Sequence, residues 1–152
     1  MTTTEDDLAM PFLLMSAFRN LVDAVHDQVA SRGFPDVRAS HGFTLQAVGA
    51  GCTSVQLGER LGVSKQAATK SASTLVDMGL LERHPNEQDR RERVLRLTPK
   101  GRELLDLSAI AFREELRSWR ETAGDAHVDA TLQTLRLVGH GGRGDTDLSD
   151  WA

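Results

Sequence analysis

The chain has 152 residues, of which 39% are hydrophobic and 26% charged, and its formal net charge is −4. This length and composition predict a soluble globular protein with one domain, or with one domain plus a dimerisation arm. The acidic, polar start MTTTEDD lacks the basic and apolar regions of a secretory signal, so we expect a cytoplasmic protein. No uninterrupted apolar run approaches the roughly 20 residues of a membrane span, and Cys52, the single cysteine, has no partner for an internal disulfide.

Basic charge is concentrated in one part of the chain. The segment from Thr53 to Lys100 has nine Lys and Arg against six Asp and Glu, a local charge of +3. The rest of the chain has nine against sixteen, a charge of −7. Because attraction to phosphates depends on local charge rather than on the total, this segment is compatible with nucleic-acid binding.

The N-terminal third is predicted to be mainly one helix. Residues 1–7 are expected to form a flexible leader, followed by an amphipathic helix from Leu8 to Ala30. Its apolar residues have spacings of four, three, four and four: Leu14, Phe18, Leu21, Val25 and Val29. A loop is expected from Ser31 to Ser40, which contains glycine and proline, and a short helix from Phe43 to Ala50 before Gly51.

Two helices joined by a tight turn are predicted next. Thr53 or Ser54 can cap the first helix, residues 61–63 form the turn, and Ser64 can cap a second helix from Lys65 to Met78. The inner face of this second helix consists of Ala68, Ala72, Leu75 and Val76. Its outer face is polar: Lys65, Gln66, Thr69, Lys70 and Ser73. Such a pair of helices can place side chains in the major groove of DNA.

A β-hairpin follows, with strands expected at Leu80–His84 and Arg93–Leu97 and an arginine-rich tip between them. Thr98-Pro99 then begins a long helix, and a last helix is expected from Ala126 to Val138. The apolar stripe of the long helix keeps a four-three-four-three spacing: Leu105, Ala109, Phe112, Leu116 and Trp119. Residues 139–152 are glycine-rich and polar, and we expect a flexible tail there.

Three motifs in this part of the chain resemble the MarR family of bacterial transcriptional regulators. They are Gly79-Leu80-Leu81-Glu82-Arg83, Asp89-Arg90-Arg91 and Leu97-Thr98-Pro99-Lys100-Gly101. In that family the pattern is a glycine-leucine start of a strand, an Asp-x-Arg wing tip and a leucine-threonine exit into a dimerisation helix. The segment from Leu57 to Ser64 is also similar, although Gly58 stands where the family more often has alanine.

The resemblance implies a mainly α fold with a small β-hairpin wing, that is, a winged helix-turn-helix with N- and C-terminal dimerisation helices. Residues 8–138 would form a single domain. Within it, residues 8–40 and 99–138 would provide the dimerisation helices and residues 41–98 the DNA-binding part. The implied function is sequence-specific DNA binding by a transcriptional regulator, and repression released by a small ligand is the commoner mode in the family.

Six candidate DNA contacts lie at the start of the second motif helix: Ser64, Lys65, Gln66, Ala67, Thr69 and Lys70. Their hydroxyl, amide and ammonium groups can donate to phosphates and base edges, while the small Ala67 leaves room for a thymine methyl. The candidates for the minor groove are Arg90, Arg91 and Arg93 at the wing. By resemblance, Arg91 enters the groove and Asp89 holds the tip in shape through an ion pair. A surface ion-pair cluster of these charges is the alternative interpretation.

A homodimer on a pseudo-palindromic DNA site is expected. One motif contacts too few base pairs to select a site in a genome, whereas two copies about one helical turn apart recognise twice as many. The two apolar stripes are the candidate seams; alternatively, both pack within one subunit. By resemblance, a small aromatic or phenolic effector can bind between the dimerisation and DNA-binding parts. Six aromatic residues could line such a pocket: Phe12, Phe18, Phe34, Phe43, Phe112 and Trp119. Aromatic residues at helical spacing usually belong to a core, so no ligand residue is assigned.

Two other functions remain open. A winged helix used for protein binding would need an exposed apolar patch on the second motif helix, whose outer face is polar. A redox-responsive regulator would use Cys52, which precedes the first motif helix, whereas redox-sensing relatives usually have their cysteine in the first helix. No catalytic constellation is recognised, so we do not expect an enzyme. The five histidines lack the spacing of a zinc site, and neither a metal nor a cofactor is expected.

Overall fold

The structure is a computed structural model that describes residues 4–139. Its elements, in chain order, are α1 (Thr4–Ser31), α2 (Ala39–Val48), β1 (Cys52–Thr53), α3 (Ser54–Leu61), α4 (Lys65–Asp77), β2 (Leu81–Pro85), β3 (Arg93–Leu97), α5 (Pro99–Ala123) and α6 (Asp125–Gly139). The mainly α fold with a β-hairpin wing is therefore confirmed. The tail expected over residues 139–152 lies outside the described residues except for Gly139, which ends α6.

Most predicted elements are found close to their predicted bounds. The strand β3 has the predicted bounds, and α6 is one residue longer at each end than expected. The N-terminal part differs more. The helix α1 begins at Thr4, so residues 4–7 of the expected leader are helical, and α2 begins at Ala39, four residues before the predicted start at Phe43.

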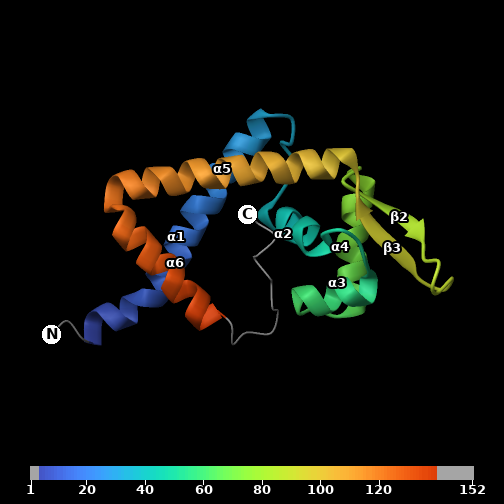
Figure 1. Cartoon of the computed structure of the whole chain (residues 1–152), viewed down its shortest axis with the longest axis horizontal. Helices are drawn as coiled ribbons and strands as arrows, with labels where there is room; N and C mark the ends of the chain where they lie inside the picture. The colour runs from blue at the N-terminus through green and yellow to red at the C-terminus, as the bar shows by residue number, and fades with distance from the viewer. Residues whose placement is uncertain (1–3, 140–152) are drawn as a thin grey trace.

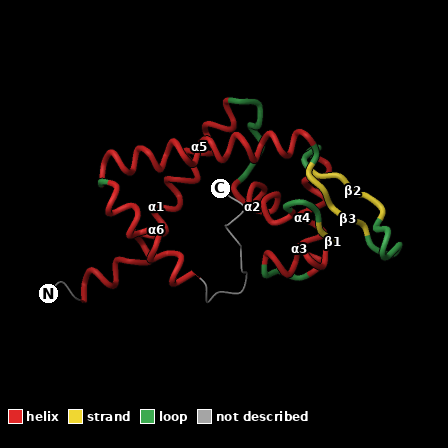
Figure 2. The backbone as a smooth tube through the Cα atoms, in the orientation of Figure 1, coloured by secondary structure: helices red, strands yellow, loops and turns green. Residues whose placement is uncertain are grey.

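The helices separate the molecule into two ends joined by α5. In Figure 1, α5 runs from the sheet at one end to α6 at the other, and α1 crosses it. The helices α2, α3 and α4 gather with the sheet, whereas α6 folds back from the far end of α5 (Figure 1). The hairpin of β2 and β3 projects beyond the helices at the edge of the molecule (Figure 2). This arrangement leaves α4 and the hairpin together at one end.

Local capping explains why α3 and α4 form where they do. The Thr53 side chain accepts a hydrogen bond from the Gln56 backbone N–H at 3.2 Å, and the Gln56 side chain accepts one from the Thr53 N–H at 2.9 Å. This reciprocal pair satisfies two N–H groups that a helix start leaves unpaired. Gly62 ends α3 with a φ of 67°, a left-handed conformation that suits glycine. Ser64 then caps α4 by accepting from the Ala67 N–H at 3.1 Å.

The hairpin belongs to a three-stranded antiparallel sheet in the order β1-β3-β2. The register of the hairpin pairs Leu81 with Leu97 and Arg83 with Leu95. The third strand, β1, was not predicted: it has only two residues and pairs Cys52 with Leu95. This pairing fixes the segment before α3 against the wing, so the wing and the helix-turn-helix form one unit.

One hydrophobic core connects α1, α2, the helix-turn-helix, the sheet and α5. The inner-face residues Ala68, Ala72 and Leu75 of α4 have no exposed surface, so the small side chains of this helix are fully packed. Gly58 also allows a close approach, because a Cβ at this position would lie 2.9 Å from the carbonyl oxygen of Val63 in the turn. The alanine more usual in the family would therefore require this turn to shift.

The first half of α1 is apolar and exposed. Within α1, Asp7–Ser31 meets the length and composition of a membrane span, and its most apolar 18-residue window has a mean hydropathy of 1.4. The sequence has no uninterrupted apolar run of that length, so this segment meets the criterion by its average composition. Only 6% of the most apolar window is buried within the chain. A second protein chain can cover such a surface as well as a membrane can.

Candidate nucleic-acid interface

The nine residues predicted to contact DNA are all exposed, and they lie on two neighbouring elements. Six lie at or after the cap of α4 and three on or beside β3, at the end of the molecule where the hairpin projects (Figures 1 and 2). An α-helix with a free polar face fits the major groove of DNA, which is about 12 Å wide. Exposure alone does not assign a contact, but none of the nine is used by the core.

The start of α4 presents free hydrogen-bond donors. Because the Ser64 oxygen accepts from the Ala67 N–H, its own hydroxyl proton remains able to donate to a phosphate. The Thr69 hydroxyl is different, since it donates to the carbonyl oxygen of Lys65 at 2.8 Å. Thr69 must break this bond before it can donate to DNA, although it can accept a hydrogen bond as it stands.

The wing tip is held by backbone hydrogen bonds rather than by the predicted ion pair. Asp89 Oδ1 accepts from the backbone N–H of Arg91 at 3.0 Å, and the Asp89 carbonyl accepts from the Glu92 N–H at 3.1 Å. Within the described residues, no ion pair joins Asp89 to Arg91. The Arg91 side chain is therefore exposed, and its guanidinium group is not paired with the Asp89 carboxylate. Among the described residues, Arg90 and Arg93 likewise form no ion pair with Asp89 or Glu92, so the structure shows no surface ion-pair cluster at the tip.

Arg83 on β2 was not singled out from the sequence, yet it joins the wing to α4. Its Nη2 donates to Ser73 Oγ at 2.7 Å, and the Ser73 hydroxyl donates to the carbonyl oxygen of Thr69 at 3.0 Å. The contact arises because alternate residues of a strand share one face, which places Arg83 on the same side as the buried Leu81. It fixes the wing relative to the outer face of α4.

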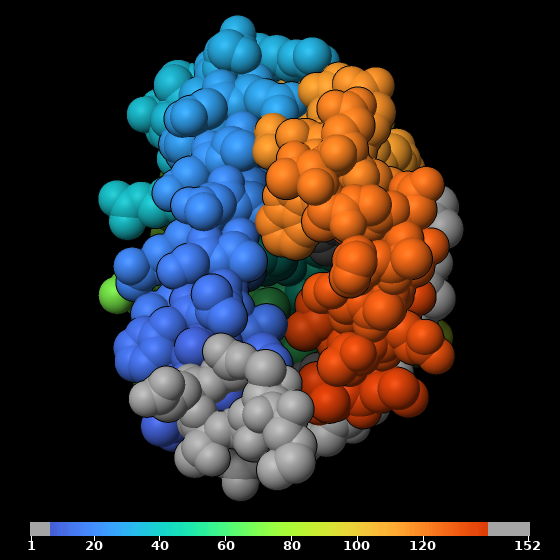
Figure 3. Space-filling model, turned by 90° about the vertical axis from the view of Figure 1, so that its left-hand side faces the viewer, coloured from blue at the N-terminus to red at the C-terminus, as the bar shows by residue number. Residues whose placement is uncertain are grey.

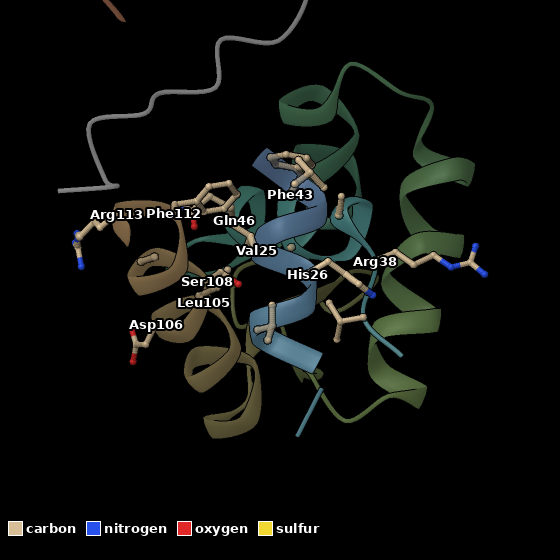
Figure 4. Close-up of a pocket in the computed structure, with 16 residues that line it drawn as sticks. Val25, His26, Arg38, Phe43, Gln46, Leu105, Asp106, Ser108, Phe112 and Arg113 are labelled. Carbon is tan, nitrogen blue, oxygen red and sulfur yellow. The ribbon is translucent and has the colours of Figure 1, made fainter. Parts of the chain in front are cut away.

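A cavity of about 320 Å³ lies between α1, α2 and α5, at the junction of the two ends of the molecule. Among the residues that line it, Figure 4 shows Gln46 and Ser108 beside apolar side chains and His26 on the other side of α1, while Arg38, Asp106 and Arg113 point away from its centre. The polar groups inside are therefore uncharged amide and hydroxyl groups and one imidazole. Of the aromatic candidates, only Phe43 and Phe112 line this cavity.

The other aromatic candidates lie elsewhere. Phe12 and Phe18 are 67% and 52% exposed on α1, and Phe34 is buried in the core. Trp119 is half-buried near the far end of α5. Only two of the six aromatic residues proposed for the pocket therefore line it. Which of them do so depends on tertiary packing, and helical spacing alone does not reveal that packing.

Cys52 is a buried thiol in the sheet. It is 2% exposed, and burial raises its pKa, while the nearby Arg60 lowers the pKa by a smaller amount. Because the thiolate is the reactive form, a raised pKa together with burial disfavours redox sensing at this residue. In the part of the chain that the structure describes, no group of three or more His, Cys, Asp or Glu residues could hold a metal ion.

Comparison with known proteins agrees with this geometry. A model of the MarR family matches residues 43–92. The HTH-type transcriptional regulator PetP of Rhodobacter capsulatus is 38% identical over 88 residues. These residues are 58% of this chain and 53% of PetP, so the chain spans about half the length of this relative in the match.

Two similar solved structures contain DNA. FabT of Streptococcus pneumoniae in complex with DNA has a TM-score of 0.72 at 25% identity, over 88% of this chain and 94% of that one. A mutant MarR of E. coli complexed with operator DNA has a TM-score of 0.67 at 22% identity, over 90% and 97%. The fold and the exposed face of α4 define a winged helix-turn-helix protein. The segment 43–92 matches the MarR family, and the chain as a whole has the fold of these solved structures.

Proposed function

We propose that this protein is a homodimeric, sequence-specific DNA-binding transcriptional regulator that acts in the cytoplasm. The observation that carries the proposal is the exposed polar outer face of α4 beside a wing whose arginines are free of acidic partners among the described residues. The helix reads base edges in the major groove, and the wing reaches the neighbouring minor groove. The DNA bound by the structural neighbours supports this assignment.

Dimerisation would be through the end of the molecule away from the wing. Large apolar residues of α1 and α6 are exposed there, including Phe12 at 67% and Leu137 at 73%. Figure 3 shows this end, where α1 and the α5–α6 arm border a hollow. Apolar surface of this extent favours a second copy, because covering it removes it from water. Two winged helices related by a two-fold axis then match an inverted repeat.

The cavity between α1, α2 and α5 would hold the effector. Its walls are largely apolar, and its inward polar groups are an amide, a hydroxyl and an imidazole, so a small, largely apolar molecule with one hydroxyl or carbonyl group fits best. A ligand can release DNA only if it binds one arrangement of the two DNA-binding ends better than the other. A cavity at the junction of the two ends is placed to make that difference, which favours a repressor released by its ligand.

Neither alternative function gains a specific observation. The outer face of α4 offers no large exposed apolar residue for a protein partner, and Cys52 is buried with a raised pKa. DNA binding is therefore the function that the structure supports best.

Selection of bound duplexes from a random DNA library, at physiological salt, tests the function. We expect enrichment of an inverted repeat whose half-sites lie about one helical turn apart. Failure to enrich any sequence, with binding that disappears as salt rises, would leave only general phosphate attraction and would contradict the proposal.

A further inference from the structure

A second, polar cavity lies along one flank of α4, between this helix and the start of α2. Its volume is about 170 Å³. It is lined by Ser40, His41, Thr44, Lys70, Ser71, Thr74 and Leu75. A water molecule occupies about 30 Å³ of liquid, so the space admits a phosphate group with some hydration. No carboxylate lines it.

Three side chains of this α2–α4 cavity carry donors that nothing else uses. Within the described residues, the hydroxyls of Ser40 and Ser71 make no side-chain hydrogen bond, and the Lys70 ammonium forms no ion pair. The two threonine hydroxyls are already committed: Thr44 donates to the Ser40 carbonyl at 2.8 Å and Thr74 to the Lys70 carbonyl at 3.3 Å. The free groups are one cation and two hydroxyls, which suits an anion with several oxygen acceptors.

His41 adds a fourth donor. Its Nδ1 lies 3.0 Å from the backbone N–H of Arg38 and accepts its hydrogen bond, so the ring proton is assigned to Nε2. Burial, and then the charge of Arg38, lower the pKa of His41. The imidazole is therefore neutral at neutral pH, with an acceptor turned to the α2 backbone and an N–H available on its other side.

The position of this cavity beside α4 indicates where its anion comes from. The outer face of α4 has Ser73 and Arg83 on its wing side and the α2–α4 cavity on the opposite side. When a helix lies in a major groove, the two DNA backbones run along its two flanks about 12 Å apart. Each flank of α4 thus carries a cation, Arg83 on one side and Lys70 on the other, with hydroxyl groups around it.

We propose that the α2–α4 cavity binds a backbone phosphate of the DNA whose major groove receives α4. Ser40, His41 and Ser71 donate to the phosphate oxygens, and Lys70 supplies the opposite charge. This assigns Ser40, His41 and Ser71 to the DNA interface, and it joins α2 to α4 through the bound strand. The proposal rests on the proposed DNA-binding function.

Ser71→Asp tests the site because it places a negative charge where the phosphate would lie. We expect the affinity to fall at least about fivefold for both the selected duplex and an unrelated duplex, and the salt dependence to lose about one counterion, because phosphate contacts carry no sequence information. Ser40→Asp should act in the same way, and an acidic residue in the first turn of α2 does not disfavour its folding. Ser31→Asp is the matched control, since it makes the same change in charge at the end of α1; it should stay within about twofold of the wild type.

The anion in this cavity could be free inorganic phosphate or a phosphate of the DNA backbone. Titration with inorganic phosphate and with duplex distinguishes the two. The imidazole resonances of His41 are followed by NMR while phosphate or duplex is added to the wild-type protein. We expect the duplex to shift them and inorganic phosphate to need high concentrations. Tight binding of inorganic phosphate, with Ser71→Asp and Ser40→Asp leaving DNA affinity unchanged, would overturn the assignment to DNA. A folded wild-type protein that bound no duplex would instead refute the proposed function.

Discussion

At the scale of single residues, Arg91 is the side chain on which minor-groove binding depends most directly. It is exposed at the wing tip, and no acidic side chain among the described residues competes for it. We expect Arg91→Ala to weaken binding to the selected duplex at least about tenfold, because the narrow minor groove concentrates negative potential. Fluorescence anisotropy measures this loss, and Arg32→Ala, at an exposed arginine in the α1–α2 loop, is the control. Equal affinity of a folded Arg91→Ala protein would remove Arg91 from the interface.

Substitutions of Asp89 test whether its side chain stabilises the wing tip through a backbone hydrogen bond or through an ion pair with Arg91. Its Oδ1 accepts from the Arg91 backbone N–H at 3.0 Å, a bond that asparagine can also form and alanine cannot. Asp89→Asn should therefore keep the DNA affinity within about twofold, whereas Asp89→Ala should lower it about fivefold or more by loosening the tip. Anisotropy titrations of the two variants side by side give the answer. Equal losses in both would favour the ion pair instead.

Gly101 is the residue at which a single methyl group should be least tolerated. Its N–H donates to Thr98 Oγ1, and a Cβ built here would lie only 2.2 Å from the carbonyl oxygen of Leu80. Gly101→Ala should therefore lower the free energy of unfolding by about 2 kcal/mol or more, since backbone must move. Gly42→Ala is the control: its Cβ would meet nothing within 4 Å, and alanine should stabilise α2 by about 0.5–1 kcal/mol. Urea denaturation measures both, and a neutral Gly101→Ala would mean that α5 can move away from the sheet.

At the scale of elements, those with local start and stop signals were predictable. Ser64 as the cap of α4, Gly62 in the turn and Thr98 before α5 act within a few residues of themselves, and the structure confirms each. The start of α2 was missed because its capping residue is Arg38, which is not among the usual caps, and the His41 ring supplies the hydrogen bond. The two-residue β1 exists only because β3 lies beside it, which no local pattern encodes.

The same distinction applies to the interface. The polar outer face of α4 follows from helical periodicity, and the sequence therefore predicted its exposed residues. Arg83 contacts Ser73 only because β2 packs over α4, and the α2–α4 cavity exists only because α2 begins early enough to bring Ser40 beside Lys70. The structure shows no ion pair between Asp89 and Arg91 among the described residues, because the short Asp89 side chain beside the turn instead accepts from the backbone two residues ahead.

At the scale of the whole molecule, the two apolar stripes do not contribute equally to a dimer seam. The second half of the α1 stripe, Val25 and Val29, is buried in the core of its own subunit, whereas Leu14 and Phe18 are 44% and 52% exposed. The predicted N-terminal dimer seam thus consists of two parts. Its second half packs in the core of its own subunit, and only its first half is exposed to a second chain. The exposed residues Leu135 and Leu137 of α6 add to that surface.

This division locates the substitution that should separate dimerisation from folding. Phe12 is 67% exposed in the single chain, so Phe12→Asp removes little from the subunit core but places a charge in the proposed seam. We expect the mass by light scattering to fall from twice 16.6 kDa towards 16.6 kDa, while the thermal unfolding of the monomer remains cooperative. Binding to the inverted repeat should fall with it, because two α4 helices no longer arrive together. Val55→Asp, at an exposed apolar residue of α3, should keep the dimeric mass; a Phe12→Asp protein that did the same would move the seam away from the first half of α1.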